Sequence, residues 1–308
     1  MKINPFSMEV GDIATGYVCL QDVTSDLTKR NSRFVRGKGV FEGLDYNIIC
    51  WDENLVDTLI GDTKVFQVCL QCGSYENEKQ YTIKEVYSVE TEADPLEYFI
   101  KVDVNDIHEK FTEFIDANFG SVYKELISKI LPDSVMNLFK AATASTYHHD
   151  NFCGGLVYHS YKVMRILNSL IDIYGLEKKR EFMLLCALVH DIGKMLAIDY
   201  KSMEYTAQGS KLSHEALGIM YLTGKSKVIL KYLTRDEFDT LLGVVENHRG
   251  HDFGANPTTL EAYLVHYADY IEAHTTALLT FIESQQNILT SPKAVKFGGH
   301  RVYVETKE

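Results

Sequence analysis

Hydrophobic and polar residues are patterned differently in two parts of this chain, and the change comes near residue 95. Before it, short runs rich in β-branched and aromatic residues lie at 14–20, 39–51, 64–72 and 80–87, with clusters of Gly, Asn and Asp between them. Short runs separated by such turn residues are typical of strands. Four or five strands in so short a stretch predict a small β-barrel or β-sandwich.

After residue 95, apolar residues recur at spacings of three and four, as they do on one face of an α-helix. The segments with this pattern are 105–118, 122–130, 133–145, 155–174, 178–192, 212–222, 235–247 and 258–283. Thr234 stands directly before one of them, in the position of a residue that caps a helix. The second part is therefore expected to be an all-α domain of seven or eight helices.

The two patterns together predict an α+β protein of two domains, at 1–95 and 96–308, the second with a C-terminal tail. A turn-rich stretch at 91–95, ending in proline, marks the boundary. A length of 308 residues with 45% hydrophobic positions is enough for two hydrophobic cores. The formal net charge of −12 argues against unspecific coating of nucleic acid but leaves room for a local basic strip.

The chain is expected to be cytoplasmic and to have no membrane segment. Its longest apolar run, 182–189, is far shorter than the roughly 20 residues that cross a bilayer. Residues 1–5 lead into no apolar stretch of the kind that secretory signals have. The six cysteines lie mostly within apolar runs, which fits thiols that are kept reduced in a cytoplasm.

Histidines are concentrated in the helical part. Nine of the eleven lie from His148 to His274, several of them beside acidic residues or glycines at predicted helix ends. A single histidine on an apolar helix is more often a structural core residue than a ligand. A group of imidazoles and carboxylates from different helices is what a metal site requires, so the set as a whole favours metal binding.

The strongest single element is 188–194, where an apolar helix runs into His190 and Asp191 and where Gly193 is expected to stop the helix. Burying an imidazole and a carboxylate is costly unless they are paired or bind a metal. Neighbouring helical residues point about 100° apart, so one ion could take His190 while Asp191 bridges to a second. Asp269, on the last long helix, is a further carboxylate for such a site.

Five motifs follow one another in the order H…HD…H…H…D: His159, His190-Asp191, His214, His248 and Asp269. This order resembles that of the HD-domain metal-dependent phosphohydrolases. The longer strings that make the likeness specific are Ala141-Ala142-Thr143, His148-His149-Asp150-Asn151-Phe152, Gly155-Leu156-Val157-Tyr158-His159 and Tyr205-Thr206-Ala207-Gln208-Gly209. With them, the chain is similar to the YhaM-type 3′→5′ exoribonucleases, which place an OB-fold ahead of an HD domain. The chain departs from that family at Arg249, where a second histidine is usual after His248.

The resemblance implies an OB-like small β-barrel at 1–95 that binds nucleic acid and an all-α HD bundle at 96–308. It also implies two divalent ions on either side of Asp191. One would be held by His159, His190, Asp191 and Asp269, and the other by Asp191, His214 and His248. The family favours manganese, while nitrogen and oxygen ligands without cysteine also suit magnesium, iron or zinc. Two ions about 3.5–4 Å apart can generate a hydroxide and stabilise both the attacking and the leaving oxygen at phosphorus, which makes Asp191 a catalytic residue.

Further residues are assigned to catalysis and to substrate binding. Lys194, one turn beyond the His-Asp pair, could neutralise charge on the pentacoordinate phosphorus, or it could be a solvated lysine at a helix end. His148 and His149 precede two glycines and could meet the phosphate or the scissile nucleotide, or cap a helix. Thr206, in a string that matches the family, and Arg249 are both assigned to substrate binding.

Five basic residues cluster in the first part of the chain, with no acidic residue between them and Glu42: Lys29, Arg30, Arg33, Arg36 and Lys38. They fall between the first and second predicted strand regions, where OB-folds carry a ligand-binding loop. The nearby aromatic residues that could offer stacking faces to bases are Phe34, Phe41, Tyr46 and Trp51. The alternative is a solvated loop beside aromatic residues of the core.

These features predict a metal-dependent 3′→5′ exonuclease that acts on single-stranded nucleic acid, RNA in preference to DNA. A second hypothesis is an HD-domain phosphohydrolase of mononucleotides or cyclic nucleotides, with the barrel as a regulatory or assembly module. A third is a nucleic-acid-binding protein with a vestigial HD site. The complete set of expected ligand types argues against the third, and the basic cluster favours the first over the second. A homo-oligomer is compatible with all three.

Overall fold

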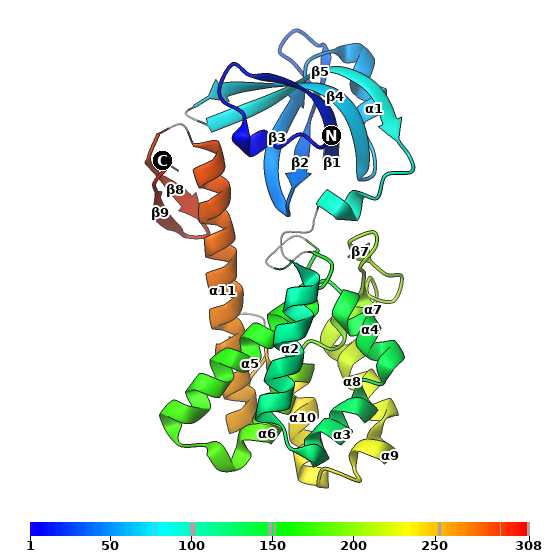
Figure 1. Ribbon diagram of the computed structural model, residues 1–308, viewed down its shortest axis with the longest axis vertical. Helices are drawn as coiled ribbons and strands as arrows, with labels where there is room; N and C mark the ends of the chain where they lie inside the picture. The colour runs from blue at the N-terminus through cyan, green and yellow to red at the C-terminus, as the bar shows by residue number, and fades with distance from the viewer. Residues whose placement is uncertain are drawn as a thin grey trace. The chain divides into compact units, whose positions relative to one another are not determined.

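The computed structural model describes residues 1–76, 78–98, 103–146, 150, 152–251, 254–289 and 291–306. The chain forms two compact units, and the first of them includes both ends of the sequence (Figure 1). One unit comprises Met1–Lys101 and Leu278–Glu308, and the other comprises Val102–Ala277. The predicted α+β class with a β domain followed by a helical domain is confirmed. The boundary proposed at residue 95 stays a prediction.

The first unit contains a closed five-stranded barrel. Its strands are β1 (Ile13–Leu27), β2 (Arg33–Phe41), β3 (Leu44–Cys50), β4 (Lys64–Tyr75) and β5 (Glu78–Glu90), and they follow the order β1-β2-β3-β5-β4 around the barrel. All neighbours pair antiparallel except β3 and β5, which are parallel, with Ile48 opposite Tyr81. A short helix α1 (Val56–Leu59) lies between β3 and β4. The OB-like architecture predicted for this part is therefore confirmed.

Tyr46 lies in the barrel core and is not a stacking face for bases, so this prediction is wrong. Only 3% of the residue is exposed. Its ring meets that of Tyr81 edge to face, with centroids 5.1 Å apart, and it covers Gly39, where a Cβ atom would come within 2.1 Å of the ring. The absence of a side chain at Gly39 thus makes room for Tyr46 inside the barrel.

Residues 39–51, predicted as one strand, form parts of β2 and β3 with a tight turn between them. Glu42 and Gly43 make this turn with φ values of 51° and 71°. Two consecutive residues at positive φ connect antiparallel strands with the natural twist of a hairpin. The sequence pattern missed the turn because glutamate seldom adopts positive φ. The first strand of this hairpin, β2, begins at Arg33, so Arg33, Arg36 and Lys38 of the basic cluster lie on a strand rather than in a loop.

The second unit is built from helices, as expected. They are α2 (Val104–Asn118), α3 (Ser121–Ile130), α4 (Asp133–Ala141), α5 (Gly155–Tyr174), α6 (Arg180–Val189), α7 (Lys194–Ala197), α8 (His214–Gly224), α9 (Ser226–Ile229), α10 (Arg235–Asn247) and the first part of α11 (Leu260–Ile288). The short strands β6 (Ile198–Asp199) and β7 (Glu204–Tyr205) pair with each other. Thr234 caps α10 as predicted, because its hydroxyl accepts from the Glu237 N–H while the Glu237 carboxylate accepts from the Thr234 N–H.

Helix α6 lies in the interior of this unit, and it therefore places the residues that follow it, His190 and Asp191, in the interior as well. Every residue from Phe182 to Val189 is buried, as expected for a helix that is apolar on all sides, and α6 packs against α5 and α10. The helix ends at Val189, earlier than predicted. Gly193 does not end it through a positive φ, since its φ is −69°. Instead, Gly193 lets α8 approach, because a Cβ atom there would lie 1.9 Å from the carbonyl oxygen of His214.

The C-terminal residues, predicted as a tail, continue α11 to Ile288 and then form a hairpin of β8 (Lys293–Phe297) and β9 (His300–Val304). An ion pair of 3.1 Å between Lys293 and Glu78 attaches this hairpin to β5 within the first unit. Among the described residues, no helix combines the length and apolarity needed to cross a membrane.

Candidate metal centre

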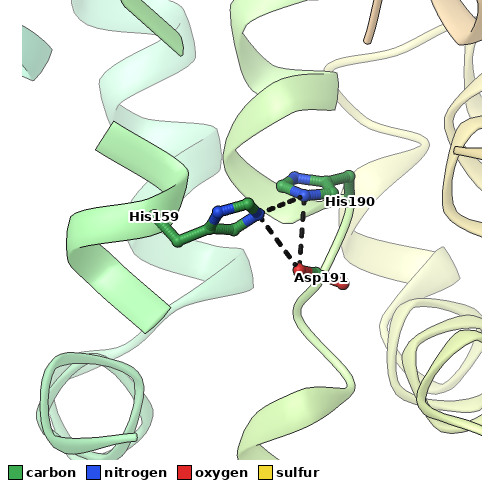
Figure 2. A group of neighbouring side chains, drawn as sticks. All are labelled: His159, His190 and Asp191. Atoms are coloured by element: carbon green, nitrogen blue, oxygen red, sulfur yellow. Dashed lines mark hydrogen bonds and ion pairs between the residues drawn. The ribbon is translucent and has the colours of Figure 1, made fainter. Parts of the chain in front are cut away.

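The six residues predicted as metal ligands come together in the helical unit, although they come from five different places in the chain. They are His159 on α5, His190 and Asp191 after α6, His214 at the start of α8, His248 after α10, and Asp269 on α11. Figure 2 shows the side chains of His159, His190 and Asp191 pointing at one another. Four of the six are at least 99% buried, namely His159, His190, Asp191 and His248. The side chains of Asp269 and His214 are 17% and 18% exposed.

The first group of ligand atoms surrounds His159. Its Nε2 atom lies 3.2 Å from His190 Nε2, 3.3 Å from Asp191 Oδ2 and 3.2 Å from Asp269 Oδ1. Donor atoms that share an ion at about 2.1 Å lie about 3.0–3.4 Å apart in octahedral or tetrahedral geometry. His190 Nε2 lies 3.4 Å from Asp191 Oδ2 and 3.9 Å from Asp269 Oδ1, so the four atoms are close enough together to share one divalent ion.

The second group uses the other oxygen of the same carboxylate. Asp191 Oδ1 lies 3.2 Å from His214 Nε2 and 3.3 Å from His248 Nε2. Within the described part of the chain, Asp191 Oδ1 and His214 Nε2 are both buried and have no hydrogen-bond partner. Leaving buried polar atoms unsatisfied is costly, and a cation between them would remove that cost. The residues present therefore fit a second ion, with Asp191 as the bridge.

Two of the histidines are oriented by the helix ends on which they stand. His190 follows α6, and its Nδ1 donates to the carbonyl oxygen of Ala187 at 2.7 Å. His248 follows α10 in the same way, and its Nδ1 donates to the carbonyl oxygen of Val245 at 2.9 Å. The last carbonyls of a helix lack partners within the helix. Using them to hold Nδ1–H fixes the ring and leaves the lone pair of Nε2 for a metal.

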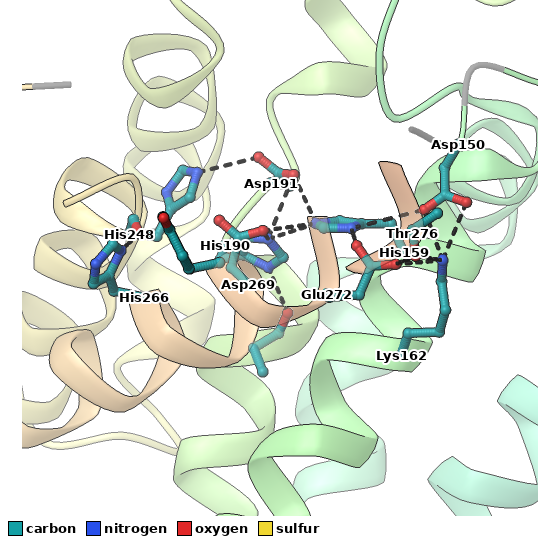
Figure 3. A network of polar contacts seen from close by, with 12 residues as sticks. Asp150, His159, Lys162, His190, Asp191, His248, His266, Asp269, Glu272 and Thr276 are labelled. Carbon is teal, nitrogen blue, oxygen red and sulfur yellow. Dashed lines mark hydrogen bonds and ion pairs between the residues drawn. The ribbon is translucent and has the colours of Figure 1, made fainter. Parts of the chain in front are cut away.

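His159 is oriented by a different partner, one that the sequence reasoning missed. Its Nδ1 lies 2.5 Å from Oε2 of Glu272, one turn after Asp269 on α11. Lys162, one turn after His159 on α5, binds both Glu272 and Asp150 (Figure 3). The signal available in the sequence was the spacing of three from Asp269 to Glu272, which puts both carboxylates on one helix face.

The electrostatics of the cluster favour a bound cation. Burial would raise the pKa of Asp191, but the charges of Lys194 and His190 outweigh it and hold that pKa well below its usual range. Burial would lower the pKa of His159, but hydrogen bonds to Asp191, Asp269 and Glu272 raise it well above 6.5. Burial lowers the pKa of His214, so this ring is neutral at pH 7 and can offer a lone pair. At neutral pH, ionised carboxylates therefore face a neutral imidazole at His214, whereas His159 has to release a proton before its Nε2 can bind a metal.

A cavity of about 560 Å³ opens beside these ligands, and two cationic side chains stand in its wall. Lys194 places its Nζ 2.6 Å from Asp191 Oδ2. Arg249 also lines the cavity, and its guanidinium lies 3.4 Å from Oε1 of Glu215. Fixed cations beside a cluster of metal ligands suit an anionic substrate such as a phosphate ester.

Three further residues of the helical unit, His148, His149 and Thr206, are predicted to contact the substrate. His148 and His149 lie outside the described residues. The Thr206 hydroxyl donates to the carbonyl of Leu196 and accepts from the N–H of Gly209, each at 2.9 Å, so it holds the turn that follows β7. The neighbouring Tyr205 lines the cavity.

The basic cluster of the barrel is partly neutralised by its neighbours. Its ion pairs join Arg33 to Asp57 at 2.8 Å, Arg36 to Asp26 at 2.9 Å and Lys38 to Asp45 at 2.9 Å. Lys29 and Arg30 lie in the connection between β1 and β2.

One aromatic pair beside the basic cluster remains open to solvent. The rings of Phe34 and Trp51 stack with centroids 4.9 Å apart, and Trp51 is 55% exposed. Phe41 instead packs against the barrel core, with its ring edge to face on Phe6. Of the four aromatic residues predicted to stack on bases, Phe34 and Trp51 are the two that do not pack into the barrel core.

The part of the chain that carries the six predicted ligands is similar to a known domain family. Residues 156–274 match the family model described as "HD domain", and all six predicted ligands lie within that range. The resemblance of the motif order to that of HD domains is thereby confirmed.

Similarity over most of the chain is found to bacterial proteins named 3′-5′ exoribonuclease YhaM. The protein from Geobacillus sp. (strain WCH70) is 23% identical over 276 residues, which cover 86% of this chain and 83% of the relative. Those from Bacillus velezensis and Bacillus subtilis (strain 168) are each 21% identical over 278 residues, covering 86% of this chain and 86% of each relative. The resemblance to the YhaM-type family is confirmed.

A shorter match involves a different kind of enzyme. A protein named dihydroneopterin 2′,3′-cyclic phosphate phosphodiesterase, from Methanocaldococcus jannaschii, is 28% identical over 141 residues. These residues cover 44% of this chain and 53% of the relative.

Proposed function

We propose that this protein is a metal-dependent 3′→5′ exonuclease that hydrolyses the phosphodiester bonds of single-stranded RNA. The observation that carries this proposal is the position of Asp191, whose two carboxylate oxygens face two separate groups of ligand atoms. The names of the relatives that match 86% of the chain support RNA as the substrate and the 3′ end as the starting point.

Two divalent ions in these groups would supply a hydroxide for attack on phosphorus and positive charge for the attacking and leaving oxygens. The ligand residues are His159, His190, Asp191 and Asp269 in one group and Asp191, His214 and His248 in the other. We propose manganese as the ion, while magnesium, iron and zinc suit the same nitrogen and oxygen ligands.

The chain's own cations have a separate role. Lys194 and Arg249 hold positive charges in the cavity wall beside the ligands. They would bind the phosphodiester and balance the charge that develops on its oxygens during attack. His148, His149 and Thr206 stay proposed substrate contacts.

The barrel would hold the rest of the strand. Lys29, Arg30, Arg33, Arg36 and Lys38 would contact phosphates, and Phe34 and Trp51 would stack on bases. Charge contacts and stacking of this kind bind single strands with little dependence on sequence. Cys19, Cys50, Cys69, Cys72 and Cys186 are free thiols, which is compatible with the cytoplasmic location that we include in the proposal.

A phosphodiesterase of mononucleotides or cyclic nucleotides is the second candidate. The match to the protein named as a cyclic phosphate phosphodiesterase, at 28% identity over 141 residues, favours it. A protein with a vestigial site is disfavoured, because the ligand atoms of both groups are in place.

One experiment separates these candidates. The protein is incubated with Mn²⁺ and single-stranded RNA labelled at its 5′ end, and in parallel with mononucleotides and 2′,3′-cyclic nucleotides. The exonuclease proposal expects a ladder of labelled products that shortens with time and is abolished by a chelator. Turnover of the small substrates with intact RNA would establish the second candidate instead.

A further inference from the structure

The cavity extends well beyond the metal ligands along one face of α11. The residues of this helix that line it are His266, Asp269, Tyr270, Ala273, His274 and Ala277. Spacings of three and four put them on a single face, and from first to last they span about 16 Å at 1.5 Å per residue. From the predicted ligand Asp269, the face continues for about two helical turns to Ala277.

Two aromatic rings on this face are stacked on each other. The ring centroids of Tyr270 and His274 are 3.8 Å apart, with an angle of 25° between the planes. The His274 ring is also fixed by a hydrogen bond of 2.9 Å from its Nδ1 to the carbonyl oxygen of Tyr270. We call this pair the Tyr270–His274 platform.

A third ring supports the platform from the side of the metal ligands. The edge of His266 meets Tyr270, with centroids 6.0 Å apart and an angle of 61°. His266 is itself held by a 2.7 Å hydrogen bond from its Nδ1 to the carbonyl oxygen of His248. Gly250 also borders the ring, since a Cβ atom there would come within 2.2 Å of it. The platform is thus fixed in place before any ligand arrives, which lowers the entropic cost of binding.

The platform remains accessible although its rings stack on each other. Tyr270 is 40% exposed, and the next cavity residues on the same face, Ala273 and Ala277, have the smallest side chains that keep a Cβ atom. A flat ring that is rigid, partly exposed and bordered by small residues offers a surface for another flat ring.

We infer that the Tyr270–His274 platform is a subsite for the base of the nucleotide whose phosphate lies at the metal ligands. The inference rests on the proposed function and deepens it, because it names the part of the substrate that this end of the cavity takes. Asp269 and Tyr270 are adjacent in the sequence and line the same cavity, and in a nucleotide only the ribose separates the phosphate from the base. Every base has a flat face, so this subsite accepts all four bases.

The test compares two ligands that differ only by the base. Binding of adenosine 5′-monophosphate and of ribose 5-phosphate is measured by calorimetry in the presence of Mn²⁺. The wild-type protein should bind the nucleotide about 5- to 150-fold more tightly, which is the effect of one stacked base. Tyr270→Leu should remove most of this preference and leave the affinity for ribose 5-phosphate unchanged, whereas Tyr270→Phe should keep the preference.

Tyr263→Leu is the matched control, because Tyr263 is a half-exposed tyrosine of the same helix whose ring contacts Tyr267 rather than the platform. It should bind both ligands as the wild type does. Equal affinity of the wild type for the two ligands would overturn the inference. So would a Tyr270→Leu variant that binds both of them more weakly by the same factor.

Failure of the proposed function has a different signature. A protein that leaves RNA intact but prefers the nucleotide through Tyr270 would refute the exonuclease and keep the base subsite. A protein that shortens RNA from its 3′ end without any preference for the base would refute the subsite and keep the exonuclease.

Discussion

Asp191 Oδ1 lies 3.2 Å from His214 Nε2, and both atoms are buried without a hydrogen-bond partner among the described residues. The other oxygen of the same carboxylate faces His159 at 3.3 Å. A carboxylate that is buried this way is stable when cations complete its surroundings. Asp191 is therefore the residue on which both groups of ligand atoms depend.

Asp191→Asn should lower the hydrolytic activity by several orders of magnitude, because the amide keeps the shape but loses the charge that two ions would share. Circular dichroism should show an unchanged helix content. Asp239→Asn is the control, since Asp239 is an exposed aspartate of α10 that pairs with Arg235. Activity of Asp191→Asn close to that of the wild type, in an assay with excess metal, would contradict the dinuclear assignment.

Gly193→Ala should displace His214, a member of the second group of ligand atoms, although Gly193 is not itself a predicted ligand. The new Cβ atom would lie 1.9 Å from the carbonyl oxygen of His214 and 2.5 Å from the Gly218 nitrogen, so α8 has to move. We expect a loss of about 1–3 kcal/mol in the free energy of unfolding and weaker metal binding.

Gly243→Ala provides the comparison for this variant, because nothing lies within 4 Å of the corresponding Cβ position on α10. It should stabilise the protein by about 0.5–1 kcal/mol, the gain of alanine over glycine in a helix. Thermal unfolding and metal titration measure both effects. Equal melting temperatures for the two variants would show that α8 does not depend on the close approach at Gly193.

Glu272→Gln should weaken metal binding although it removes none of the six predicted ligands. The carboxylate of Glu272 lies 2.5 Å from His159 Nδ1 and thereby fixes the ring that presents Nε2 to the metal. Loss of such a partner typically lowers metal affinity by about 10- to 100-fold. Titration with Mn²⁺ measures it, with Glu246→Gln, an exposed position of α10, as the control. If both variants bind Mn²⁺ like the wild type, Glu272 has no part in positioning His159.

Binding of metal should release at least one proton at pH 7. Burial lowers the pKa of His159, but hydrogen bonds to its carboxylate partners outweigh burial and raise that pKa well above 6.5. Without metal, the protonated ring therefore stabilises the fold fully below pH 6.5, and this stabilisation is lost as the pH rises through the folded-state pKa. Because a metal needs the deprotonated Nε2, its affinity should increase with pH over the same range.

Calorimetric titration with Mn²⁺ in buffers of different ionisation enthalpy counts the released protons. His300→Gln, a change at an exposed residue of β9, should release the same number as the wild type. A heat of binding that does not depend on the buffer would show that His159 is already neutral in the metal-free protein.

Neutralising three exposed cations of the barrel should weaken RNA binding and its dependence on salt. We choose Lys29, Arg30 and Arg36, because the first two lie in the connection after β1 and Arg36 keeps 67% of its side chain exposed despite its ion pair. Replacing all three by glutamine should lower the slope of log affinity against log salt by about two, at about 0.7 for each phosphate contact.

The matched triple variant replaces three exposed lysines of the helical unit by glutamine, namely Lys178, Lys227 and Lys231. Its salt dependence should match that of the wild type, and both variants should hydrolyse a small phosphodiester normally. An unchanged slope in the barrel variant would indicate that its basic cluster serves folding or assembly instead of RNA binding.

Local periodicity was sufficient to find most of the helices. The spacing of apolar residues predicted α5 and α10 to the residue, Gly155–Tyr174 and Arg235–Asn247. Helices obey such rules because their hydrogen bonds join residues four apart, so the pattern that one face must bury is present in any short window of sequence. The candidate ligands could be found for a related reason, since few residue types bind divalent ions and their order along the chain matched a family.

Only the tertiary structure decided how these residues meet. Glu272 and His159 are 113 residues apart, and no local pattern relates them. The same holds for the barrel, where Tyr46 turned inward because Gly39 on the paired strand leaves space for its ring. The sequence by itself determined which segments are helices or strands and which residues could bind metal, because these are properties of short segments and residue types. Which side chains share an interior depends on packing between distant segments, and only the folded chain specifies it.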